Sequence, residues 1–115
     1  MLPIQEITIR TKNKRLFAVH LESWSQNHFE CKLAAINLGP QLPADATFGP
    51  FVKGESALSA YTSLISTLTN SLKNLDTTDE VAEIDNPCNT EFISASEQKQ
   101  IVGQNVLVKV NGSAA

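Results

Sequence analysis

The stretch "SALSAYTSLISTLTNSLKNL", residues 56–75, decides the expected fold because its apolar side chains follow a long helical repeat. They recur every three or four positions, which is the pattern of an amphipathic helix with one buried stripe. At 1.5 Å per residue such a helix extends roughly 30 Å, long enough to cross a three-stranded sheet. The apolar positions are Leu58, Tyr61, Leu64, Ile65, Leu68, Leu72 and Leu75.

Ser56, at the start of this stretch, fits two interpretations. A nucleophile elbow places its serine between two glycines, but Leu58 stands where the second glycine should be. A helix cap needs only a side-chain oxygen that accepts a hydrogen bond from the first turn, and Glu55 would lie near the positive end of the helix dipole. We therefore interpret Ser56 as the cap of a helix over about residues 56–75.

Three segments before the helix alternate apolar and polar residues, which is the pattern of half-buried β-strands. They are Ile4–Arg10, Leu16–Glu22 and Phe29–Leu38, and the polar turns "TKNKR" and "SWSQNH" separate them. Short polar turns favour antiparallel neighbours, so we expect a three-stranded meander. Its expected core face carries Ile7, Ile9, Phe17, Val19, Leu21, Phe29, Cys31 and Leu33.

The segment between the third strand and the helix, Gly39–Lys53, contains three prolines and two glycines. This composition predicts a long loop, with Phe48 and Phe51 as apolar anchors. Long loops in small domains are often functional, so this loop is one candidate contact surface.

The segment after the helix, Asp76–Glu91, carries six acidic residues and no basic residue, and we expect an acidic linker or surface loop. A C-terminal element over residues 92–110 follows. It is expected to hold a short helix that starts at Ser94 or Ser96, a strand that includes Val106 and Val108, or both. Residues 111–115 are expected to fray.

These elements predict a single α+β domain over residues 1–115, with its core in residues 3–75. The expected architecture is a three-stranded antiparallel meander packed by one long amphipathic helix, followed by a short helix and/or strand (βββα, then αβ). A chain of 115 residues is long enough to bury such a core.

The net charge of −3 argues against direct binding of nucleic acid, which requires many basic side chains. The charge is unevenly distributed along the chain. Four basic residues lie near the tip of the first predicted hairpin, and the acidic run of residues 76–91 could fold back onto that tip. The four are Arg10, Lys12, Lys14 and Arg15.

The chain begins without a secretory signal pattern, and no stretch reaches the length of about 20 apolar residues that a membrane span requires. We therefore expect a cytoplasmic protein that does not enter a membrane. Its two cysteines, Cys31 and Cys88, are expected to be unpaired thiols in that reducing compartment.

The residue patterns favour no enzyme, cofactor or metal. Ser96 and Lys99 match S-x-x-K, but the partner motifs of that chemistry are missing from the sequence. His28 and Cys31 have the spacing of half a zinc site, without a second half. Phosphate-binding glycine motifs are also missing.

The pattern instead favours a non-catalytic protein-binding module: a small inhibitor, an immunity-type protein or an anti-defence accessory protein that blocks a partner protein. The partner could have a basic surface that meets the acidic run. The alternative is a structural or assembly subunit that self-associates as a homo-oligomer through the uncharged outer helix face or the C-terminal strand. The candidate contact residues are Asp76, Asp79, Glu80, Glu83, Asp85, Ser63, Ser66, Thr67, Asn70, Phe48 and Phe51.

Overall fold

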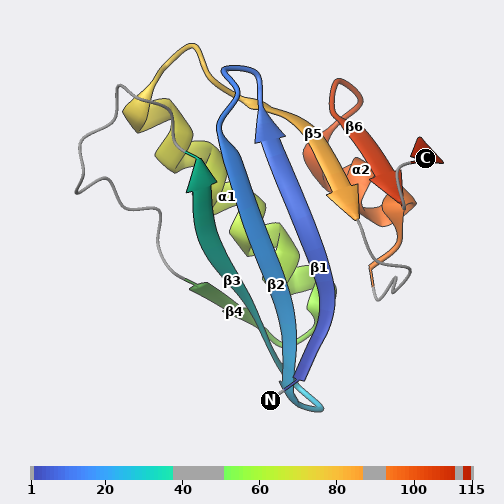
Figure 1. Ribbon diagram of the computed structural model, residues 1–115. Coiled ribbons are helices and arrows are strands. Elements are labelled where there is room, and N and C mark those ends of the chain that lie inside the picture. Colours follow the sequence, from blue (N-terminus) through green and yellow to red (C-terminus); the bar gives the residue numbers. More distant parts are fainter. Residues whose placement is uncertain (1, 38–50, 87–92, 111–112, 115) are drawn as a thin grey trace.

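A mixed β-sheet with both helices on one of its faces makes up the fold (Figure 1). The computed structural model describes residues 2–37, 51–86, 93–110 and 113–114. Two helices lie behind the sheet in this view, and the front face of the sheet carries neither of them. We call this front face the free face.

The predicted meander is present at the centre of the sheet. It consists of β1 (Leu2–Thr11), β2 (Leu16–Ser25) and β3 (His28–Asn37). Both pairs are antiparallel, with Ile7 opposite Val19 and Leu21 opposite Cys31. These four side chains are buried on the helix side of the sheet, which confirms their predicted core face.

The sheet is larger than the predicted meander, and its strand order is β4-β3-β2-β1-β5-β6-β7. On one side, β4 (Phe51–Gly54) pairs with β3. On the other side, β5 (Val81–Asn86) lies antiparallel to β1, and β6 (Leu107–Val110) lies parallel to β5. The two-residue strand β7 (Ser113–Ala114) ends the sheet, so these residues of the expected frayed tail are paired.

The predictions of a loop through Lys53 and of an acidic linker over residues 76–91 were therefore wrong for β4 and β5. In β5 the acidic residues alternate with inward-facing ones: Ile84 and Asn86 are buried, and Glu83 and Asp85 are less buried. Acidic composition suggested solvated chain, but half-buried strands tolerate charge on one face. The pairing with β1 decides that this segment is a strand.

Helix α1 (Ala57–Leu75) confirms the long predicted helix. Ser56 is its N-cap: the hydroxyl of Ser56 accepts from the amide of Ser59, and the hydroxyl of Ser59 accepts from the amide of Ser56. Leu58 was wrongly placed on the buried stripe, since 38% of it is exposed. Ala57 and Ala60 are buried instead, and Ala60 lies close to Gly54 of β4.

A shorter helix, α2 (Ala95–Val102), confirms the predicted C-terminal helix. Ser94 caps it, and the side chain of Glu97 accepts a hydrogen bond from the amide of Ser94. The helix connects β5 to β6, the crossover that a parallel pair of strands requires. Neither helix of the described chain is long and apolar enough to cross a membrane.

Three buried amide side chains hold this crossover against the meander. Gln5 of β1 donates to Asn86 of β5 at 2.8 Å and accepts from the backbone N–H of Ile93 at 2.7 Å. Gln98 of α2 donates to the side chain of Asn86 and to the carbonyl of Ile93. Because buried amides are costly unless they are hydrogen-bonded, this pairing favours one position of α2 on the sheet.

Candidate functional site

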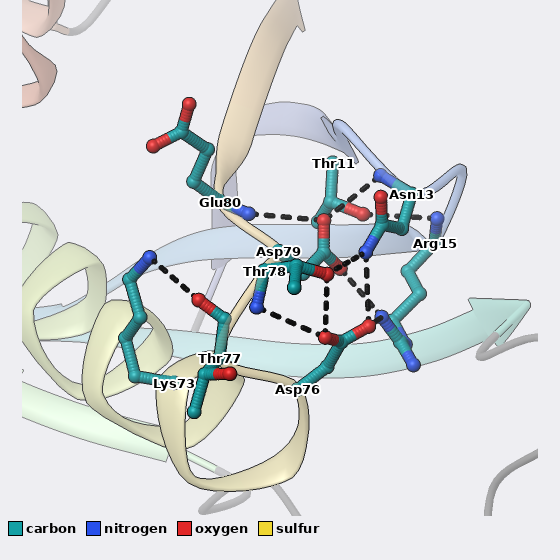
Figure 2. A network of polar contacts seen from close by, with 9 residues as sticks. All are labelled: Thr11, Asn13, Arg15, Lys73, Asp76, Thr77, Thr78, Asp79 and Glu80. Atoms are coloured by element: carbon teal, nitrogen blue, oxygen red, sulfur yellow. Dashed lines mark hydrogen bonds and ion pairs between the residues drawn. The ribbon is translucent and has the colours of Figure 1, made fainter.

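A cluster of charged side chains joins the tip of the β1–β2 hairpin to the turn that follows α1 (Figure 2). Arg15 lies at the hairpin tip, with its Nη1 atom 2.7 Å from Oδ2 of Asp79 and 3.2 Å from Oδ2 of Asp76. Asp79 is fully buried and Arg15 is 8% exposed. We call Arg15, Asp76 and Asp79 the clasp.

Neutral groups complete the hydrogen bonding of the clasp. The backbone N–H of Asn13 donates to Asp79 at 2.8 Å, and its side-chain amide donates to Asp76 at 2.9 Å. The hydroxyl and backbone N–H of Thr78 also donate to Asp76. The backbone carbonyl of Glu80 accepts from the N–H of Lys12 at 2.8 Å, which joins the same two segments.

These contacts favour the charged forms of both aspartates. Hydrogen bonds from Thr78, Asn13 and Arg15 hold the pKa of Asp76 well below its usual range. Burial by itself would raise the pKa of Asp79, but hydrogen bonds from Arg15 and Asn13 outweigh it and the pKa is lowered. Both carboxylates thus stay ionised as structural acceptors, whereas a general acid or base near neutral pH needs a pKa close to that pH.

The clasp shows that the predicted acidic contact residues are not all available to a partner. Two of its five acidic candidates, Asp76 and Asp79, contact the basic hairpin tip of the same chain, which is the fold-back arrangement considered from the sequence. The carboxylate of Glu83 lies 3.4 Å from Nε of Arg10 and 2.7 Å from Nζ of Lys109. The five acidic side chains therefore do not form one continuous row, and Glu80 is the exposed member of the group.

The remaining predicted contact residues lie in two other places. Four of them are exposed on the outer face of α1: Ser63, Ser66, Thr67 and Asn70. Phe51 is the first residue of β4, and Phe48 lies outside the described residues. The four helix residues thus lie on a different element from the clasp.

An exposed aromatic cluster at the turn between β2 and β3 was missed from the sequence. Trp24 is 45% exposed and stacks on His28, with the ring centroids 6.0 Å apart and the planes at 22°. The Nζ atom of Lys32 lies 5.5 Å from the centroid of the Trp24 ring. A tryptophan within the polar turn "SWSQNH" was the sequence signal that could have identified this cluster.

Two glutamates on the free face support this aromatic cluster. Glu22 and Glu30 are paired across β2 and β3 and are only 6% and 7% exposed. Like charges opposite each other destabilise a sheet, and here the ammonium of Lys32 compensates. Lys32 lies 3.2 Å from Glu22, and Nε2 of His28 lies 2.9 Å from Glu30, although not in hydrogen-bonding geometry. The indole N–H of Trp24 donates to Glu22 at 3.3 Å.

The nucleophile and metal candidates occupy structural positions. Ser56 caps α1, and Lys99 donates to the backbone carbonyl of Val106 at 3.1 Å. Cys31 is a free, buried thiol whose pKa burial raises to about 12, and Cys88 lies outside the described residues. The described part of the chain contains no group of three or more His, Cys, Asp or Glu side chains that could hold a metal ion.

Comparison with known proteins found no relative: no family model matches the chain, and neither a curated protein nor a solved structure matches it.

Proposed function

We propose that this chain is a non-catalytic protein-binding module whose contact surface centres on Trp24. Trp24 carries the proposal because an exposed tryptophan held in a fixed position is the residue type that most often dominates the energy of protein interfaces. Its ring offers a large apolar area, and the charged side chains of Glu22 and Lys32 lie beside it.

The contacts around Trp24 favour binding because they reduce the entropy that binding would cost. The stack on His28 and the hydrogen bond to Glu22 restrict the ring before any partner arrives. An ordered side chain avoids an entropic cost of about 0.5–1.5 kcal/mol when the interface forms. Lys32 supplies a charged group at the edge of the same surface.

The module we propose is a small inhibitor, an immunity-type protein or an anti-defence accessory protein that blocks a partner by covering its surface. The small size of the chain and its net charge of −3 support this class. Glu83 and Asp85 lie on the free face, as Glu22 and Glu30 do, so predicted acidic residues and Trp24 share one side of the sheet. A partner with basic groups around an apolar centre would complement this side.

Capture from the cells that naturally produce the chain tests this proposal. Photoreactive residues at Gln26, beside the aromatic cluster, and at Ser66, on α1, would report which side meets the partner. We expect cross-linking from position 26 and loss of the partner in Trp24→Ala. Leu58→Ala, which also removes an exposed apolar side chain, should retain the partner. Capture that is unaffected by Trp24→Ala would contradict the proposal.

A second candidate is an assembly subunit that self-associates through α1. The outer face of this helix supports it, because its exposed side chains between Glu55 and Lys73 are uncharged and, apart from Leu58, are Ser, Thr or Asn. Light scattering separates the two candidates. Self-association should survive neutral substitutions at Glu80, Glu83 and Asp85 but be lost in Ser66→Arg. A monomer at all concentrations would exclude assembly.

A further inference from the structure

A groove of about 390 Å³ lies between α1 and the turn that follows α2. One wall is the line of Ile65, Thr69 and Lys73 along α1. The opposite wall includes Ile101 and Val102 of α2 and the turn of residues 103–105. Val81 of β5 and Val106 also line the groove. The volume falls within the range of small-molecule sites, about 300–1,000 Å³.

The polarity of the groove changes along its α1 wall. Ile65, Thr69 and Lys73 are spaced four residues apart on one helix face, so an apolar side chain, a hydroxyl and an ammonium follow one another over roughly 12 Å. Ile101 and Val102 remain partly exposed in the groove although both pack against the core. A ligand that matches this wall would have an apolar body and a polar head near Lys73.

The polar end of the groove carries one cation, Lys73, and one anion, Glu80. The Nζ atom of Lys73 donates to the backbone carbonyl of Thr77 at 3.4 Å, a long hydrogen bond that leaves other donor positions of the ammonium open. Glu80 also lines the groove, and Figure 2 shows the side chains of Lys73 and Glu80 extending to the same side. Glu80 should therefore oppose an anion that Lys73 attracts.

We propose that this groove binds a small apolar carboxylate, with its hydrocarbon part against Ile65, Ile101 and Val102 and its carboxylate at Lys73. This site is separate from the Trp24 surface and does not depend on the proposed protein-binding function. The ligand class follows from Lys73, which continues the α1 wall beyond Ile65 and Thr69, since a carboxylate and a hydrocarbon chain complement an ammonium beside an apolar wall. The carboxylate of Glu80 opposes this binding, so its removal is part of the test below.

Three probes with eight-carbon chains and different head groups test the preferred charge of the head: octanoate, octanol and octylammonium. Titration calorimetry of the full chain, below micelle-forming concentrations, should give the tightest binding for octanoate. Amide chemical shifts measured in parallel should change at Gly103 and Asn105, which line the groove. Equal affinity for octanol, or tighter binding of octylammonium, would overturn the proposed head group.

Two charge variants should change the affinity for octanoate in opposite directions. Lys73→Gln should weaken octanoate binding by roughly two- to fivefold, the value expected for one exposed ion pair. Glu80→Gln should tighten octanoate binding and weaken octylammonium binding by a similar factor. Lys14→Gln, an exposed lysine outside the groove, is the charge control and should leave the affinity unchanged.

A matched pair on α1 tests the location of the site. Thr69→Phe places a ring in the groove and should abolish binding, whereas Thr67→Phe, at an exposed position outside the groove lining, should not. Circular dichroism would establish that both variants keep the wild-type fold. Octanoate binding that survives Thr69→Phe, or no measurable binding by the wild-type chain, would overturn the proposal.

Discussion

At the residue scale, the clasp shows how a charged pair is tolerated inside this small protein. Arg15 and Asp79 are both buried, and each makes further hydrogen bonds within the same cluster. Removing only one partner of a buried pair leaves an uncompensated charge, which costs more than removing both. The clasp should therefore affect stability far more than the less buried pair of Arg10 and Glu83.

The Arg15–Asp79 pair gives the first prediction. Arg15→Met should lower the free energy of unfolding by about 3–5 kcal/mol, because it leaves the carboxylate of Asp79 buried without its cation. Asp79→Leu should lower it by less, because Arg15 keeps its contact with Asp76. The double variant should lose less than the sum of the two losses, by at least about 1 kcal/mol. Urea unfolding of the four proteins measures this coupling. Additive losses would show that the two side chains do not act as a pair.

The lowered pKa values of Asp76 and Asp79 predict a loss of stability in acid. Their folded-state pKa values lie below the ordinary value of about 3.9, so their contribution is complete above that pH and is lost as the pH falls below it. Asp76→Asn should reduce the decrease in unfolding free energy between about pH 5 and pH 2. Glu55→Gln, at an exposed position, serves as the control. An unchanged pH profile for Asp76→Asn would contradict the role of this carboxylate.

Tyr61 is a buried residue whose hydroxyl has no hydrogen-bond partner within the described residues. Burial raises the pKa of Tyr61, so it remains a neutral phenol. Because an unsatisfied buried hydroxyl carries a desolvation cost, Tyr61→Phe should leave stability unchanged or raise it by up to about 1 kcal/mol. Thermal unfolding would measure this change. A loss above about 1 kcal/mol would indicate a hydrogen bond to the hydroxyl.

At the element scale, local sequence patterns predicted an element correctly when the residues of that element alone determine its secondary structure. The spacing of Tyr61, Leu64 and Leu68 predicted α1, and Ser56 predicted its start. The start of α2 was left open between Ser94 and Ser96, and the cap is Ser94. The strands β4 and β5 were missed because proline, glycine or acidic composition suggested loops. Their identity depends on neighbouring strands, which local propensity does not describe.

The close contact between β4 and α1 predicts that a side chain at Gly54 would destabilise the fold. A Cβ atom at Gly54 would lie 2.5 Å from the backbone nitrogen of Ala60, so the strand and the first helical turn would have to separate. Gly54→Ala should therefore lower the free energy of unfolding by about 1–3 kcal/mol. The neighbouring exposed change Glu55→Ala should stay within about 0.5 kcal/mol. Chemical denaturation compares the two, and equal effects would contradict this steric explanation.

At the scale of the whole molecule, the sheet has a long centre and short edges. β1 and β2 are ten-residue strands with neighbours on both sides, while β4 has four residues and β7 has two. Local opening requires less free energy where fewer contacts are broken. We therefore expect stability to decrease from the meander toward both edges.

Amide hydrogen exchange tests this order. Amides of β1 and β2 that are hydrogen-bonded between strands should exchange only through global unfolding, with the largest opening free energies in the molecule. Amides of β6 should exchange faster, because its outer neighbour β7 pairs with only two of its residues. Equal protection across the sheet would show that the edges open only together with the centre.

Some of the candidate sites could be predicted from the sequence, and others could not. The uncharged outer face of α1 and its exposure followed from the helical repeat. The clasp, the aromatic cluster at Trp24 and the groove between α1 and α2 did not, because each joins residues from separate elements. Their chemistry depends on distances and burial that no local pattern contains.

Local sequence patterns were sufficient to predict the long helix, its cap at Ser56 and the central meander, because periodicity and capping act over a few residues. They left the C-terminal element open between a helix and a strand, and its cap open between Ser94 and Ser96. Only the tertiary structure decided that β5 pairs with β1, that α2 crosses to a parallel strand, and that Asp76 and Asp79 bind Arg15 instead of facing solvent. The physical reason is that strand pairing and charge compensation are gained between segments far apart in the chain. Their free energy depends on which partners the fold brings together.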